Sequence, residues 1–192
     1  MTANKMTANN HKKNLVVFCG ARFPQVNESE LVQLKSQLTE LCQKLAPHYN
    51  LIYGGGRVGI MGLVADAFLQ FDGHVTGVIP EYLNTVEIQH EGVHHTEVVD
   101  DLHQRKKMME TQGDLFLVLP GGLGTLDELC EVLTLQALSR HEKTIYIWNW
   151  KNIYDGFFKF IEDGVQKGMI SANVLGSCVV QKEFQDLVKF ML

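Results

Sequence analysis

Short apolar runs that end in glycine or proline alternate with helix-forming segments along nearly the whole chain. The runs have the length and the β-branched or aromatic character of buried strands, and they cover residues 14–19, 50–53, 74–79, 115–119 and 144–148. A weaker strand is expected at a sheet edge near 93–99, and a short one at 179–180. Helices are predicted over 28–46, 61–71, 101–111, 125–138, 154–167 and 184–192.

Strands this continuously apolar need helices on both faces of a parallel sheet. Because crossovers between parallel strands are right-handed, the alternation predicts an α/β fold with one doubly wound, Rossmann-like sheet. Two helix starts are marked by capping boxes, in which Asn27 pairs with Glu30 and Asp101 with Gln104.

One domain suits 192 residues, since chains divide only beyond roughly 250–300 residues. Residues 14–192 contain no linker or repeat and are expected to form that domain, whereas the polar residues 1–13 are expected to be a flexible tail. No apolar run approaches the ~18 residues of a membrane span. The cysteines lie far apart, which favours buried free thiols in the cytoplasm; they are Cys19, Cys42, Cys130 and Cys178.

The charge balance argues against nucleic acid as a partner. Seventeen Lys and Arg residues stand against 22 Asp and Glu residues, giving a net charge of −5, whereas nucleic-acid binding depends on neutralising phosphates. His94 and His95 have no third ligand at metal-binding spacing, so no metal is expected.

The first glycine-rich loop, Gly54–Gly59, matches G-x-G-x-x-G between a predicted strand and a predicted helix. It follows the second strand instead of the first, and no clear ribose-binding acid lies about 20 residues further on. A tight turn that lets the backbone approach a ligand is therefore favoured over a dinucleotide site. Gly54, Gly55 and Gly56 are the candidate binding residues of this loop.

The second loop is more informative. Gly121, Gly122 and Gly124 remove side chains from the turn before a helix, so backbone N–H groups and the positive helix end can meet an anion there. Thr125 can add a hydroxyl, and the absence of a Walker lysine favours a monophosphate. An alternative remains open, because Thr125 and Glu128 also have the spacing of a capping box, which would make Glu128 purely structural.

Two cations and a second acid favour the anion site. Arg105 and Lys106 lie near the N-terminal end of a predicted helix, where the helix dipole disfavours positive charge. Their position is better explained by an anion in front of them. Glu131 lies three residues after Glu128, on nearly the same helix face.

The pair Arg105-Lys106 followed by P-G-G-L-G-T-L-D-E at residues 120–128 closely resembles the Lonely Guy (LOG) phosphoribohydrolases. Their P-G-G-x-G-T-x-x-E signature is matched at every fixed position, and the resemblance extends over about residues 15–190. It implies hydrolysis of the N-glycosidic bond of a nucleoside 5′-monophosphate, a cytokinin riboside 5′-monophosphate or AMP, to free base and ribose 5-phosphate.

The resemblance also implies roles for single residues. Glu128 and Arg105 correspond to the catalytic pair, and no cofactor is expected. The implied substrate-binding residues are Glu87, Lys106, Gly121, Gly122, Leu123, Gly124, Thr125, Leu126, Asp127, Glu131 and Thr134. The family further implies a homodimer. Arg57, Leu123 and residues 21–24 depart from the family pattern, and these departures concern base preference.

Two other classes of function remain open on this fold. One is a non-catalytic nucleotide-binding or carrier module that uses the same phosphate site, because doubly wound folds host many unrelated functions. The other is a dinucleotide-dependent oxidoreductase that uses the first glycine loop. The combination of Arg105 with Glu128 favours the enzyme.

Overall fold

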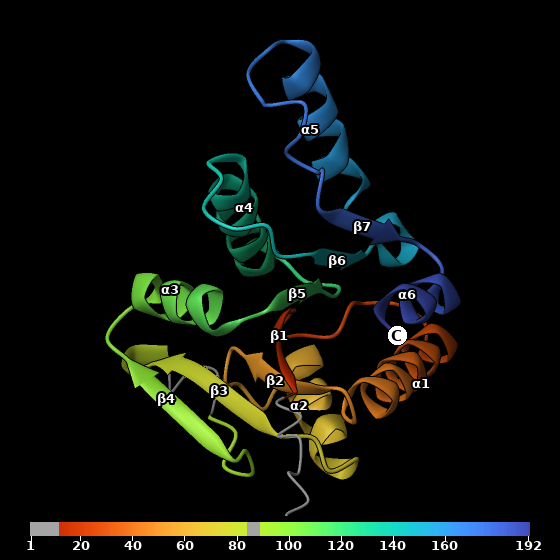
Figure 1. The fold of residues 1–192 in the computed structure, drawn as a ribbon. Coiled ribbons are helices and arrows are strands. Elements are labelled where there is room, and N and C mark those ends of the chain that lie inside the picture. Colours follow the sequence, from red (N-terminus) through yellow and green to blue (C-terminus); the bar gives the residue numbers. More distant parts are fainter. Residues whose placement is uncertain (1–11, 84–88) are drawn as a thin grey trace, which may run out of the picture.

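The computed structural model describes residues 12–83 and 89–192, and across these residues it contains one seven-stranded sheet (Figure 1). All neighbouring strands are parallel, in the order β4-β3-β2-β1-β5-β6-β7. The strands are β1 (Lys13–Phe18), β2 (Tyr49–Tyr53), β3 (Val75–Pro80), β4 (His95–Val99), β5 (Leu115–Val118), β6 (Ile145–Trp148) and β7 (Cys178–Gln181). The predicted strand near 93–99 is confirmed as an edge strand.

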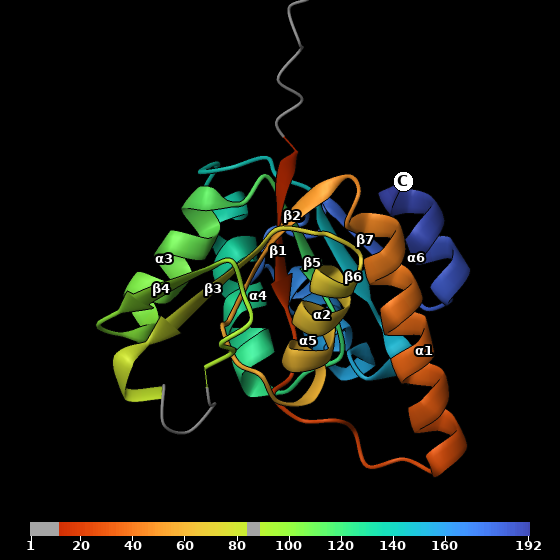
Figure 2. The ribbon, with the colours of Figure 1, turned by 90° about the horizontal axis from the view of Figure 1, so that it is seen from below.

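Helices cover both faces of this sheet, as predicted. They are α1 (Glu28–Leu45), α2 (Gly59–Gln70), α3 (Leu102–Gln112), α4 (Leu123–Ala137), α5 (Asp155–Gln166) and α6 (Phe184–Met191), with short 3-10 turns η1 (Glu81–Leu83) and η3 (Trp150–Asn152). Helices α1, α2 and α6 lie on one face and α3, α4 and α5 on the other (Figure 1). Figure 2 shows α1 and α6 side by side.

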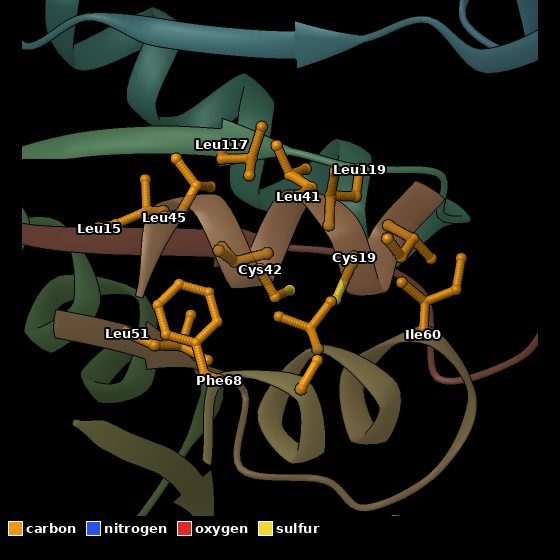
Figure 3. Close-up of a cluster of buried hydrophobic side chains, with 14 of the residues drawn as sticks. Leu15, Cys19, Leu41, Cys42, Leu45, Leu51, Ile60, Phe68, Leu117 and Leu119 are labelled. Carbon is orange, nitrogen blue, oxygen red and sulfur yellow. The ribbon is translucent and has the colours of Figure 1, made fainter. Parts of the chain in front are cut away.

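Two buried clusters hold these layers together. Leu15 and Val17 of β1 point into the cluster with α1, α2 and α6, part of which Figure 3 shows. Val16 and Phe18, which alternate with them, point into the cluster with α3, α4 and α5. Because both faces of such a strand are buried, neither face needs polar side chains for contact with solvent, which explains the unbroken apolar runs in the sequence.

Two predicted helix caps are confirmed. The side chain of Asn27 accepts a hydrogen bond from the Glu30 backbone N–H at 2.9 Å, and that of Asp101 accepts one from the Gln104 N–H at 2.8 Å. Each cap satisfies an N–H group that the first helical turn leaves without a partner.

The capping box proposed for Thr125 and Glu128 is wrong. Helix α4 begins at Leu123 with Gly122 as its N-cap, so Thr125 lies inside the first turn. Its side chain is buried against Gly121, where an added Cβ would overlap the Thr125 hydroxyl. Glu128 is thus not required to cap the helix.

The cysteines agree with the prediction only in part. All four are free, but Cys130 is exposed on α4, and Cys178 is only partly buried. Within the described residues, none of the helices is both long and apolar enough to cross a membrane.

Candidate active site

The strand order places a crevice at the carboxyl end of β1. Chain segments run outward from β1 through β2, β3 and β4 on one side, and through β5, β6 and β7 on the other. Such a switch point is where doubly wound sheets bind ligands. A cavity of about 590 Å³ lies there, and it is lined by Cys19–Pro24, Ile60, Met61, Leu83, Leu102, Arg105, Lys106, Pro120–Gly122, Gly124, Thr125, Asp127, Glu128 and Ile153.

The glycine loop after β5 forms one wall of this cavity. Within residues 12–83 and 89–192, no side chain caps α4, and an added Cβ at Gly122 or Gly124 would meet nothing within 4 Å. At its base the loop is held to the loop after β1, where the Gly20 N–H donates to the Pro120 carbonyl at 3.1 Å. The uncapped first turn of α4 thus presents N–H groups and positive helix-end charge on a firm support.

Arg105 of α3 and Glu128 of α4 meet beside this loop. The Arg105 Nη2 atom lies 3.5 Å from Glu128 Oε1, and the two side chains are only 8% and 11% exposed. Buried charges are stable when they are paired. The Arg105 Nε atom is buried without a hydrogen-bond partner among the described residues, so the guanidinium retains an unused donor.

Gly54 provides the surface against which Arg105 packs. A Cβ at Gly54 would overlap the Arg105 Nη2 atom, so only glycine leaves room for the guanidinium in this position. The close approach predicted for this loop therefore exists, but its partner is a side chain of the same protein. Among the residues that line the cavity, none comes from Gly54–Gly56.

Lys106 ties α3 to α4. Its ammonium group lies 2.7 Å from Glu131 Oε2 and 3.0 Å from Asp127 Oδ2. Partial burial lowers the pKa of Lys106, but the ion pairs with Glu131 and Asp127 outweigh this and raise it above the ordinary value. Lys106 thus fixes the helix that carries Arg105 against the helix that carries Glu128.

The remaining predicted residues lie at different distances from the cavity. Leu123 stands at the loop with 86% of its surface exposed, and Leu126 packs into the α3–α5 side of the core. Glu131 and Thr134 lie further along α4 and do not line the cavity; the Thr134 hydroxyl donates to the Cys130 carbonyl at 2.7 Å. Glu87 lies outside the described residues.

The apolar side chains at the cavity that were not predicted include Leu83, Leu102 and Ile153. Leu83 lies just beyond β3, Leu102 beyond β4 and Ile153 beyond β6. Their position after the carboxyl end of a strand was the available signal, because that edge of the sheet faces the ligand. Across the described part of the chain, no group of three or more His, Cys, Asp and Glu side chains could hold a metal ion.

Comparisons with known proteins identify the family of this chain. A family model described as possible lysine decarboxylase matches residues 61–191. The chain is 38% identical over 178 residues to cytokinin riboside 5′-monophosphate phosphoribohydrolase LOG1 of Arabidopsis thaliana, covering 92% of this chain and 81% of that protein. A probable enzyme of the same description from rice, LOGL3, is 38% identical over 177 residues, with 92% and 82% covered.

Solved structures share the fold at lower identity. The molybdenum cofactor binding protein of Rippkaea orientalis superposes with a TM-score of 0.65 at 17% identity, and 94% of this chain and 96% of that one are covered. The molybdenum cofactor carrier protein of Chlamydomonas reinhardtii gives 0.66 at 15% identity, with the same coverage. These two likenesses concern the fold alone, whereas the family match and the curated relatives cover the site, and the chain belongs to the Lonely Guy (LOG) family.

Proposed function

We propose that this protein hydrolyses the N-glycosidic bond of a nucleoside 5′-monophosphate, a cytokinin riboside 5′-monophosphate or AMP, and releases free base and ribose 5-phosphate. The observation that carries the proposal is the buried Arg105–Glu128 pair, which shares one cavity with the uncapped start of α4. The first supplies charge for bond cleavage, and the second supplies a place for phosphate. The curated relatives named above are described as phosphoribohydrolases.

The phosphate group would bind at the first turn of α4. Backbone N–H groups at Gly122 and Gly124 are unobstructed by side chains, and the helix end adds positive charge. Anchoring the nucleotide by its phosphate converts binding energy into orientation of the distant C1′–N bond. A cavity of about 590 Å³ is within the range of small-molecule sites.

Glu128 would act at the ribose. Cleavage of the C1′–N bond builds positive charge on the sugar ring, which a nearby carboxylate stabilises. Water adds its hydroxyl group to C1′ and its remaining proton ends on the departing base; Glu128 can accept that proton from the water in transit. Arg105, whose Nη2 atom lies 3.5 Å from Glu128 Oε1, would hold this carboxylate in place beside the substrate.

The apolar side of the cavity bears on the choice of base. Leu102 and Ile153 line the cavity and remain partly exposed, so they offer contact area to an apolar substituent on the base. This composition favours an N6-prenylated base over plain adenine. Incubation with AMP, GMP, CMP, UMP and isopentenyladenosine 5′-monophosphate, followed by chromatography of the liberated bases, decides the preference.

We further propose that the protein is a cytoplasmic homodimer. Helix α4 and its C-cap expose the apolar side chains Leu123 and Leu138, which a second copy would cover. All four cysteines are free, as is usual in a reducing compartment. Sedimentation equilibrium of the full chain tests the dimer, and a monomer at micromolar concentration would contradict it.

Glu128→Gln is the sharpest test of the enzymatic proposal. The substitution keeps the shape of the side chain and removes its charge, so base release should fall by roughly a thousandfold. Glu110→Gln is a matched control, because Glu110 is an ion-paired carboxylate of α3 that lies outside the main cavity. Unchanged base release in Glu128→Gln would exclude a catalytic role for Glu128.

A carrier module on the same fold would bind nucleotides without cleaving them. Binding of AMP or isopentenyladenosine monophosphate by calorimetry, together with no liberated base, would support that alternative. The proximity of a buried carboxylate to an anion-binding helix end favours catalysis, because a carrier gains nothing from a charge that repels its ligand.

A further inference from the structure

The connection between β6 and α5 contains unusual backbone geometry. Lys151 and Asn152 adopt φ values of 49° and 62°, the left-handed region that non-glycine residues rarely occupy. Two such residues in succession cost free energy, and they persist only where surrounding contacts determine the conformation. The contacts of the neighbouring residues show which side chain this turn holds in position.

Asn149 holds the turn closed from inside the protein. It is 1% exposed, its Oδ1 atom accepts a hydrogen bond from the Tyr154 N–H at 2.8 Å, and its amide nitrogen donates to Asp155 Oδ1 at 2.6 Å. The Asn149 backbone N–H is itself anchored to the Gln181 carbonyl of β7 at 2.8 Å. Both ends of the turn are thereby fixed, and the residue that they fix is Tyr154.

Tyr154 extends from this turn to the start of the second glycine loop. Its side chain is buried, and its hydroxyl donates to the Leu119 carbonyl at 2.6 Å and also forms a hydrogen bond with the Gly121 backbone. Burial is the largest cause that raises the pKa of Tyr154, and electrostatic interaction with Cys19 and Glu128 raises it further, so the hydroxyl stays protonated and able to donate. Tyr154 is not among the residues that line the cavity.

We propose that Tyr154 is a positioning residue that sets the conformation of the Leu119–Gly121 segment and thereby holds the start of α4 ready for a phosphate group. Its hydroxyl bonds to the residues on both sides of Pro120, which itself has no N–H to donate. The ligand chemistry rests on the proposed function, whereas the effect on the loop does not.

Tyr154→Phe tests this role, and Tyr49→Phe is a matched control. The Tyr49 hydroxyl also donates to a backbone carbonyl, that of Met191 at 3.0 Å, but it lies at the opposite end of the sheet. Amide hydrogen exchange of the peptide covering residues 119–125 should become at least about tenfold faster in Tyr154→Phe and stay unchanged in Tyr49→Phe, because a buried carbonyl loses its donor.

Kinetics and binding give the second measurement. In Tyr154→Phe, the KM of the preferred nucleotide and the Kd of ribose 5-phosphate should rise about tenfold, with kcat changed by less than about threefold. A merely destabilised protein would lose active molecules, which lowers apparent kcat and leaves KM unchanged.

The two proposals can fail separately. Unchanged exchange at residues 119–125 in Tyr154→Phe overturns the positioning role even if the wild-type protein releases base. Faster exchange confined to that peptide supports the positioning role even if the wild-type protein releases no base from any nucleotide, in which case only the enzymatic proposal fails.

Discussion

The two glycine-rich loops look alike in sequence but are used in opposite ways. At the first loop, the amides that open α2 are occupied, since the Ile60 and Met61 N–H groups both donate to the Gly20 carbonyl, at 3.1 and 3.2 Å. At the second, no side chain of the described residues caps the first turn of α4, and none of their atoms lies within 4 Å of a Cβ added at Gly122 or Gly124. Both loops follow a strand and precede a helix, yet only the second leaves a helix end available.

Glycine serves packing in one loop and access in the other. Around Gly54–Gly62 an added Cβ would overlap atoms of Ala21, Arg57 or Arg105, so these glycines let parts of the protein approach one another. The first loop therefore does not have the free helix end on which a dinucleotide's pyrophosphate would bind. Its contribution to the site is indirect, through the surface that Gly54 gives to Arg105.

Gly59→Ala should have the largest effect on stability. Gly59 has a φ of 61°, and its added Cβ would overlap the Ala21 backbone, which cannot move without disturbing the loop after β1. The free energy of unfolding should fall by at least about 3 kcal/mol, measured by urea denaturation. Gly168→Ala is the control, because Gly168 has a φ of 71° but open space around it, and it should cost only about 1 kcal/mol.

Gly54→Ala should act mainly on turnover. Its Cβ would displace the Arg105 guanidinium, and misplacement of a catalytic group by about 1 Å can cost roughly a hundredfold in rate, or about 2.7 kcal/mol. Gly113→Ala is also crowded, by the side chain of Val16, but neither residue lines the cavity or contacts Arg105, so this variant should lower stability without changing kcat/KM. Equal loss of kcat/KM in both variants would mean that Gly54 has no particular relation to Arg105.

Local signals predicted local structure, and the site depends on contacts between distant residues. The Asn27 cap was predictable because donor and acceptor are three residues apart. The start of α4 was not predictable, because both Gly122 and Thr125 are residue types that can serve as an N-cap. The burial of Thr125 against Gly121, which no local pattern reveals, makes Gly122 the N-cap. The contact of Gly54 with Arg105 joins the first glycine loop to helix α3, 51 residues further along the chain, and no local sequence pattern at either residue predicts it.

The proximity of Arg105 and Glu128 was predicted from charge placement and from the family resemblance, and not from a local structural pattern. Charge near a helix start suggested an anion, and the family resemblance then identified the partners, but neither argument gives the 3.5 Å geometry. Lys106 shows the limit of such reasoning. Its position next to Arg105 suggested a phosphate contact, whereas in the folded chain its charge is engaged by Asp127 and Glu131.

Lys106→Met should reveal how the second loop is supported. Close backbone packing stabilises the first loop, whereas the ion pairs of Lys106 stabilise the helix that follows the second loop. Loss of two partly buried pairs should lower stability by about 1–2 kcal/mol at pH 7. Because the pKa of Lys106 is raised, its contribution is complete below the unfolded-chain value of about 10.4 and is lost as pH rises through the folded-state pKa.

Urea denaturation from pH 7 to 11 should therefore show the gap between wild type and Lys106→Met closing only above about pH 10. Lys107→Met is the control, because the exposed Lys107 is the next residue of α3 and should change stability by less than about 0.5 kcal/mol. A gap that closes near neutral pH would show that Lys106 is not held by these carboxylates.

Gly124→Ala should have the smallest effect on stability, and the effect should be favourable. Gly124 lies in the first turn of α4, where alanine is the better helix former and no atom opposes its Cβ, so stability should rise by about 0.5 kcal/mol. Gly156→Ala is a close match, since Gly156 is also the second residue of a helix and also faces open space.

The two variants should differ in their affinity for AMP. The space in front of Gly124 is where the phosphate is proposed to lie, so the new methyl group should weaken AMP binding about threefold or more, whereas Gly156→Ala should leave it unchanged. Calorimetric titration of both variants measures this directly. If Gly124→Ala binds AMP as tightly as wild type, the start of α4 does not hold the phosphate, and the contrast between the two glycine loops loses its functional meaning.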